Sequence, residues 1–281
     1  MTLDPITLAY EDENGKIYYA DSMTYFDKRV TGEDIIISGS YAAGPTVAWA
    51  LNIGAKGGIA HAAGVGKDDA GISGLALAEN HGMPAAACET MSARLADGES
   101  VHKGIVGHAN GIALGLGVEI GQPIAEASRL MLRAPSRYPT DLGEEAISNK
   151  IYTLEKTPNG IVYASWGIPV LRSIKEPRPN DMFVQASHCG ETLSKFVIPL
   201  RLKGVIANDA GKGLDNSGIS SFGPLQEAGI AAAAVGSMTA RIGDVMSTWN
   251  DGKISAANGK AETLGVRAGM TVPEASRKIL G

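Results

Sequence analysis

The chain contains a long internal duplication, and this feature constrains its fold more than any other. A shift of 147 positions aligns residues 56–97 with residues 203–244 without a gap, and 19 of the 42 pairs are identical. Eleven of these pairs are Gly or Ala, but the others include Asp68/Asp215 and Arg94/Arg241. After a one-residue slip, EASR at 126–129 matches EASR at 274–277. The period is far longer than a solenoid repeat, so each copy is predicted to be a domain-sized unit.

Each copy alternates short apolar segments with helical patterns. In the first copy, residues 34–40, 56–62 and 83–89 have the length and composition of buried strands. Residues 44–54 and 71–82 between them are predicted helices, which end at glycines. This order implies a parallel sheet with right-handed crossovers. We therefore expect an α/β fold: a tandem duplication of a parallel-sheet α/β unit, with two halves packed about a pseudo-twofold axis.

The predicted domains are a first repeat at 1–133, a connecting segment at 134–150 and a second repeat at 151–281. The connecting segment is marked by prolines and charged residues. Small-residue segments such as GIALGLG at 111–117 suit a homo-oligomer interface, although packing within the repeat explains them equally well.

Composition restricts the class of partner and the compartment. The formal net charge of −5 argues against nucleic acid or an anionic membrane as the main partner. Two cysteines are too few for a disulfide framework, and no apolar run reaches the roughly 18 residues of a membrane span. The acidic N-terminal stretch does not resemble a secretory signal. We expect a cytoplasmic protein that acts on a small molecule.

A glycine-rich loop follows the second predicted strand of each copy, as HAAGVGKDDAGI at 61–72 and NDAGKGLDNSGI at 208–219. Gly64 and Gly66 lie between a strand and a helix, where backbone N–H groups can bind an anion. Their spacing is neither that of a dinucleotide-binding fold nor that of a P-loop, so no cofactor is predicted. The alternative is that these glycines only permit tight turns and close packing.

The residues expected to bind a substrate lie in three loops per copy, beyond the carboxyl ends of the strands. Arg94 and Arg241 are candidates for holding a carboxylate or phosphate, or for bracing a loop through neighbouring aspartates. Asp68 and Asp215 are either ligand contacts or turn formers. The full predicted binding set is Ser40, Ser187, Gly64, Gly66, Lys67, Asp68, Arg94, Asn208, Asp209, Lys212, Asp215 and Arg241.

Residues that differ between the copies are candidates for chemistry that the fold does not itself require. The second copy alone has SHCGE at 187–191, where the first has SYAAG. A thiol at a predicted helix start beside an imidazole has the ingredients of a thiolate nucleophile, so Cys189, His188 and Glu191 are predicted catalytic residues. His61, from the other copy, is an alternative base. The competing interpretation is a small buried cysteine.

Three functions remain open from the sequence. The leading one is a hydrolase-like enzyme acting on a small anionic carboxylate, amide or ester, with its site between the repeats. The second is a metal-dependent lyase or hydrolase using His61, Asp68 and Glu89 or His102, although the spacing matches no dense ligand motif. The third is a non-catalytic module that binds a small anion, such as a phosphorylated metabolite.

Overall fold

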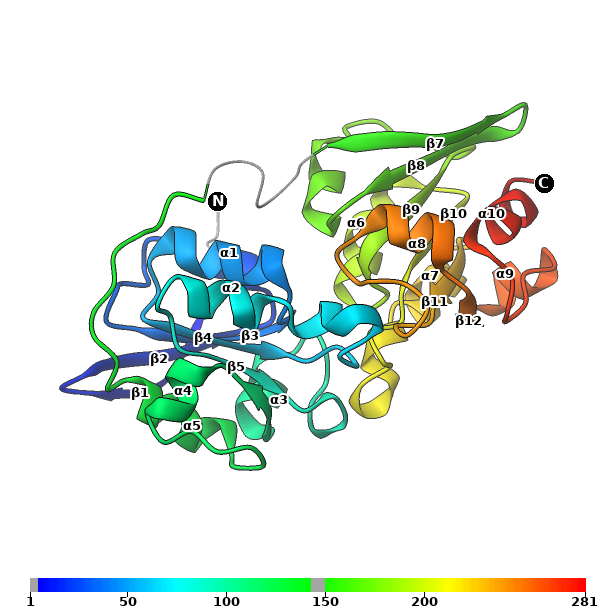
Figure 1. Ribbon diagram of the computed structural model, residues 1–281. Coiled ribbons are helices and arrows are strands. Elements are labelled where there is room, and N and C mark those ends of the chain that lie inside the picture. The colour runs from blue at the N-terminus through cyan, green and yellow to red at the C-terminus, as the bar shows by residue number, and fades with distance from the viewer. Residues whose placement is uncertain (1–4, 143–149) are drawn as a thin grey trace. The chain divides into compact units, whose positions relative to one another are not determined.

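The computed structural model describes residues 5–142 and 150–281, which form two similar α/β halves with one six-stranded sheet each (Figure 1). The strands and helices of the first half are β1 (Thr7–Asp12), β2 (Gly15–Ala20), β3 (Ile35–Tyr41), α1 (Gly44–Ile53), β4 (Gly57–His61), α2 (Gly74–Asn80), β5 (Ala85–Cys88), α3 (Gly98–Lys103), β6 (Val106–Ala109), α4 (Gly111–Gly115) and α5 (Ile124–Met131). Those of the second half are β7 (Ile151–Thr157), β8 (Gly160–Ser165), β9 (Met182–His188), α6 (Thr192–Leu200), β10 (Gly204–Asn208), α7 (Phe222–Glu227), β11 (Ala231–Val235), α8 (Val245–Asp251), β12 (Ile254–Ala257), α9 (Gly259–Thr263) and α10 (Val272–Leu280).

Each sheet is mixed, not the purely parallel sheet expected from the sequence. The strands follow chain order, from β1 to β6 in one sheet and from β7 to β12 in the other. The inner pairs β2–β3, β3–β4 and β4–β5 are parallel, whereas β1–β2 and β5–β6 at the two edges are antiparallel. The second sheet repeats this pattern. The two residues between β1 and β2 allow a hairpin but are too few for a parallel crossover.

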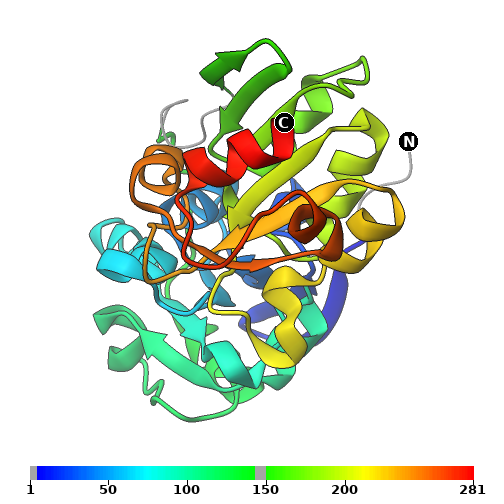
Figure 2. The ribbon, with the colours of Figure 1, turned by 90° about the vertical axis from the view of Figure 1, so that its right-hand side faces the viewer.

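Successive side chains of a strand point to opposite faces of the sheet, and in the central strands both sets are apolar. Helices cover both faces of each sheet and bury these side chains. In β10, Val205 and Ala207 contact the core formed with α6 and α7. Ile206, between them, belongs to the core formed with α8 and α10. Figure 2 shows α10 in red beside this second sheet. The first half has the same arrangement, with α1 and α2 over one face and α3, α4 and α5 over the other.

Contacts between Cα atoms divide the described chain into two units that exchange short segments. Unit 1 contains residues 5–63, 71–142 and 213–215, and unit 2 contains residues 64–70, 150–212 and 216–281. Part of each glycine-rich loop therefore belongs to the unit built mainly from the other repeat. The sequence did not predict this exchange, because no local pattern specifies which half a loop contacts.

The predicted connecting segment begins on unit 1. Residues 134–142 pack against that unit, and residues 143–149 lie outside the described residues. No helix among the residues that the structure describes is long and apolar enough to cross a membrane.

Candidate functional site

Cys189, the predicted nucleophile, lies in the core of unit 2. Its side chain is fully buried, and its Sγ donates to the carbonyl oxygen of Ala233 at 3.5 Å. It packs with apolar residues of α6 and α7. Burial raises the pKa of this thiol, so it is protonated at neutral pH. This environment is that of a small core residue, and it gives no support to a thiolate nucleophile.

His188 and Glu191 flank Cys189 in sequence but have other partners. The Nδ1 atom of His188 accepts a hydrogen bond from the backbone N–H of Gly190 at 3.0 Å, and the ring is buried. The carboxylate of Glu191 forms an exposed ion pair with Lys195, one helical turn further on, at 3.4 Å. These contacts stabilise the turn that leads into α6.

His61 and Asn208 occupy equivalent positions and make equivalent hydrogen bonds. His61 Nε2 lies 3.1 Å from the carbonyl oxygen of Ala93, and Nδ1 accepts from the N–H of Ala63 at 3.0 Å. Asn208 Nδ2 donates to the carbonyl oxygen of Ala240, and Oδ1 accepts from Ala210, at 3.2 and 2.8 Å. Both side chains therefore tie the glycine-rich loop to the loop after the next strand.

The His61 ring is neutral in this arrangement. Burial lowers its pKa, outweighing the carbonyl groups that favour the charged ring. Because Nδ1 accepts a backbone hydrogen bond, the ring proton lies on Nε2 and points at carbonyl oxygens. Neither nitrogen is left to act as a base, so the difference from Asn208 is a structural replacement.

The glycine-rich loops have an unusual left-handed backbone in both copies. Four consecutive residues, from Ala63 to Gly66, have φ between 50° and 78°, and the four from Ala210 to Gly213 have φ between 52° and 67°. Glycine adopts this region freely, which explains Gly64 and Gly66, whereas a β-branched Val65 is strained there. The shared glycine frame thus encodes a shared backbone path.

The shared arginines and aspartates form ion pairs inside the two units. In unit 1, Arg94 Nη1 lies 2.8 Å from Asp215 Oδ2. In unit 2, Arg241 Nη1 lies 3.0 Å from Asp68 Oδ2. Each arginine also pairs with the aspartate three residues further on, at 4.0 and 3.0 Å. Two carboxylates around each guanidinium leave no excess positive charge for an anion, so these contacts favour the bracing role.

Asp209 is a buried structural carboxylate. Its Oδ1 accepts from the backbone N–H groups of Gly211 and Ser237 at 3.0 and 2.9 Å, and its Oδ2 accepts from Ser255 Oγ at 2.8 Å. These hydrogen bonds compensate the carboxylate for its lost hydration and fix the second glycine-rich loop.

The remaining predicted binding residues differ in their surroundings. Ser40 Oγ accepts a backbone N–H from residue 23 at 3.0 Å, and Ser187 is buried. Lys67 pairs with Asp251 at 2.8 Å, and Lys212 is exposed.

A metal centre has no ligand set in the part of the chain that the structure describes. No group of three or more His, Cys, Asp or Glu there has metal-binding geometry. Asp68 belongs to unit 2, whereas His61, Glu89 and His102 belong to unit 1. His102 stacks on Tyr19, with 5.7 Å between the ring centroids.

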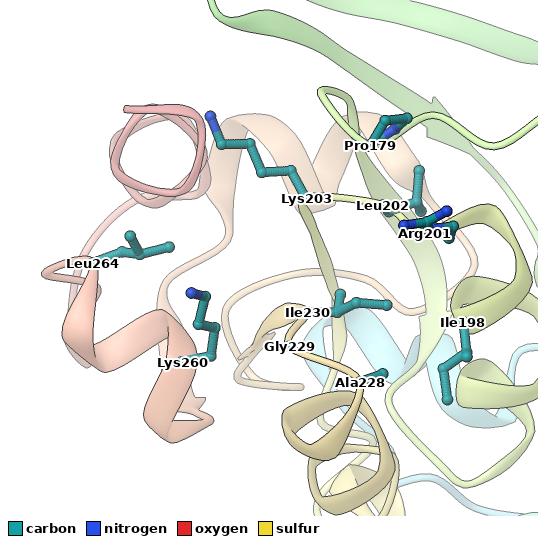
Figure 3. A pocket seen from close by; sticks show the side chains of 10 residues that line it. All are labelled: Pro179, Ile198, Arg201, Leu202, Lys203, Ala228, Gly229, Ile230, Lys260 and Leu264. Atoms are coloured by element: carbon teal, nitrogen blue, oxygen red, sulfur yellow. The ribbon is translucent and has the colours of Figure 1, made fainter.

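A cavity of about 490 Å³ lies in unit 2, at the amino ends of β9, β10 and β11 (Figure 3). The site predicted from the sequence is at the carboxyl ends of the strands, so the cavity is at the other end of the same strands. None of the predicted site residues lines it. The lining residues are Pro179, Ile198, Arg201, Leu202, Lys203, Ala228, Gly229, Ile230, Lys260 and Leu264.

The cavity has three cationic side chains and no acidic one. Lys260 comes from α9 on one side, and Arg201 ends α6 on the other (Figure 3). Lys203 extends from the start of β10, and its Nζ donates to the carbonyl oxygen of Leu280. The sequence analysis did not single out these residues. A comparison of the two copies would have drawn attention to Arg201, which stands where the first copy has Gly54.

Comparisons with protein-family models, with curated proteins and with solved structures found no match for this chain.

Proposed function

We propose that the chain binds a small anion in the cavity of unit 2. The observation that carries this proposal is the set of three cations in one cavity without an acidic neighbour in its lining. Among the described residues, none of Arg201, Lys203 and Lys260 forms a salt bridge. Like charges repel one another, so a bound anion would stabilise this arrangement.

The backbone at Arg201 supports the same proposal. This residue follows α6 in the left-handed region, with φ 51° and ψ 37°, a position that glycine usually fills. A residue with a side chain pays about 1 kcal/mol for this conformation. The backbone at this position therefore does not favour arginine over glycine, whereas the guanidinium adds a cation to the cavity lining.

The size and exposure of the cavity fit a small ligand. Its volume falls within the range of roughly 300–1,000 Å³ that is typical of small-molecule sites. Arg201 and Lys260 are exposed, so the affinity for an anion should fall as salt concentration rises.

Isothermal titration calorimetry with inorganic phosphate at low ionic strength tests the proposal. Arg201→Ser and Lys260→Gln should each weaken binding, since each removes one cation from the cavity. Lys175→Gln removes a charge from an exposed residue outside the cavity and should bind as the unaltered protein does. Equal phosphate binding by all four proteins, or none by any, would overturn the proposal.

The hydrolase-like activity, cytoplasmic location, homo-oligomeric assembly and pseudo-twofold packing of the halves remain predictions. Product analysis after incubation with any bound ester or amide separates an enzyme from a binding protein. The buried thiol of Cys189 favours the binding protein.

A further inference from the structure

In unit 1, positions equivalent to the cavity lining of unit 2 are contacted by the chain's own residues 137–140. After α5, the backbone N–H of Arg137 donates to the carbonyl oxygen of Gly32 at 3.0 Å, and its guanidinium donates to that of His81 at 2.6 Å. The N–H of Thr140 donates to the carbonyl oxygen of Leu51 at 2.9 Å. The counterparts of the contacted residues line the cavity of unit 2: Pro179 for Gly32, Ile198 for Leu51 and Ala228 for His81.

Two glycines allow the main chain of residues 137–140 to follow this path in unit 1. A β-carbon on Gly32 would lie 1.8 Å from the carbonyl oxygen of Arg137, and one on Gly54 would lie 2.7 Å from the nitrogen of Pro139. Neither distance is compatible with a side chain. The path of residues 137–140 therefore depends on the absence of side chains at both positions.

The second copy has Pro179 and Arg201 at these two positions. A polypeptide that followed the same path across unit 2 would overlap both side chains. An extended segment like residues 137–140 of unit 1 therefore cannot lie across the cavity along this path. A ligand of the cavity must be more compact.

The same comparison shows two positions at which unit 2 has a cationic side chain and unit 1 has not. Arg201 replaces Gly54. Lys260 replaces Ile112, because Asn110 and Asn258 are equivalent N-caps of α4 and α9, each accepting a backbone N–H three residues further on.

The shared lysine differs in its acidic partner. In unit 1, Lys56 pairs with Glu33 at 3.0 Å. In unit 2, Asn180 stands at the position of Glu33, so Lys203 has no equivalent carboxylate. Each of these differences makes the cavity of unit 2 more attractive to an anion.

Apolar side chains also line the cavity. Ile198, Leu202, Ile230 and Leu264 come from both sides of the cavity (Figure 3). Ile198 is 37% exposed, so apolar surface is available to a ligand. A bare inorganic anion would leave this surface in contact with water, whereas a ligand with an apolar body would cover it.

We infer that the cavity selects a compact amphipathic anion: a small apolar body that carries a phosphate or carboxylate group. This inference rests on the proposed function. It adds that the anion is attached to an apolar group, and that an extended acidic peptide is not the ligand.

The test compares three probes by calorimetry: inorganic phosphate, phenyl phosphate and hexaglutamate. Phenyl phosphate should bind at least about tenfold more tightly than inorganic phosphate, because the ring covers apolar surface. Ile198→Gln, at a partly exposed position, should reduce that preference, because it removes apolar surface from the cavity. Hexaglutamate should bind more weakly than phenyl phosphate.

Two outcomes separate failure of this inference from failure of the proposed function. Equal affinity for the two phosphates, or tighter binding of hexaglutamate, overturns the inference while anion binding at Arg201 stands. Absence of binding by all three probes, or binding that Arg201→Ser does not weaken, overturns the proposed function and the inference with it.

Discussion

Arg201 occupies in unit 2 the left-handed backbone position that Gly54 occupies in unit 1. The φ and ψ angles are 51° and 37° for the arginine and 78° and 24° for the glycine. Gly54 follows α1 and Arg201 follows α6, which are equivalent helices of the two halves. The fold accepts glycine at this point without strain, so the arginine is a substitution with a conformational cost.

Arg201→Gly should stabilise the protein and weaken its binding of phosphate. Glycine relieves the left-handed strain, which should raise the free energy of unfolding by about 1 kcal/mol, while loss of the guanidinium removes a cation from the cavity. Urea denaturation and calorimetry measure the two effects. Arg201→Lys keeps both the charge and the strain, and should change neither quantity strongly. A destabilised Arg201→Gly protein would contradict this explanation.

His61→Asn should be tolerated much better than His61→Ala. Asn208 makes the same two hydrogen bonds in the second copy, whereas alanine leaves a buried N–H and a carbonyl group without their partner. Such a loss costs about 1–3 kcal/mol. Urea denaturation of both variants measures the difference. Equal destabilisation would show that the ring, and not its hydrogen bonds, holds the loop.

The stability of the protein should fall as pH decreases below the ordinary pKa of histidine, in part because of His61. Burial lowers the pKa of this ring in the folded state, so the unfolded chain binds the proton more readily. The stabilisation is complete above the unfolded-state pKa of about 6.5 and is lost as pH falls toward the folded-state pKa. His61→Asn should show a shallower loss between pH 7 and pH 5 in urea denaturation. An unchanged slope would contradict the neutral, buried ring.

Cys88 and Cys189 should both resist thiol reagents in the native protein. Both side chains are fully buried, and burial raises the pKa of Cys88 to about 11 and also raises that of Cys189. Reaction with a chromogenic disulfide should be complete in guanidinium chloride and negligible without it. Fast native labelling that Cys189→Ala abolishes would instead support the thiol chemistry expected from the sequence.

Much of the architecture was predictable from local patterns. The apolar runs at 34–40, 56–62 and 83–89 correspond to β3, β4 and β5, because a strand buried on both faces needs a continuous apolar segment. The predicted helices at 44–54 and 71–82 correspond to α1 and α2. The antiparallel edge strands were not predicted. One of them, β6, is short and partly exposed, so its sequence has little apolar pattern.

The candidate site was not predictable in the same way. The sequence comparison directed attention to positions where the copies differ, and among these it favoured reactive residue types such as Cys189 and His61. In the tertiary structure Cys189 is buried in the core, and His61 makes hydrogen bonds equivalent to those of Asn208. The side chains of Arg201 and Lys260, in contrast, line a cavity. Whether a cavity forms depends on which segments pack around it, and a local sequence pattern does not specify this.

The sequence by itself determined the duplication, the α/β class and the glycine frame of the two loops, because these depend on local periodicity and backbone freedom. Only the tertiary structure decided that part of each glycine-rich loop belongs to the unit built mainly from the other repeat, and that Asp68 and Asp215 neutralise arginines. It also decided that residues 137–140 cover positions in unit 1 whose equivalents line an open cavity in unit 2. These outcomes depend on contacts between segments far apart in the chain, and on whether a side chain such as that of Arg201 leaves room for another segment.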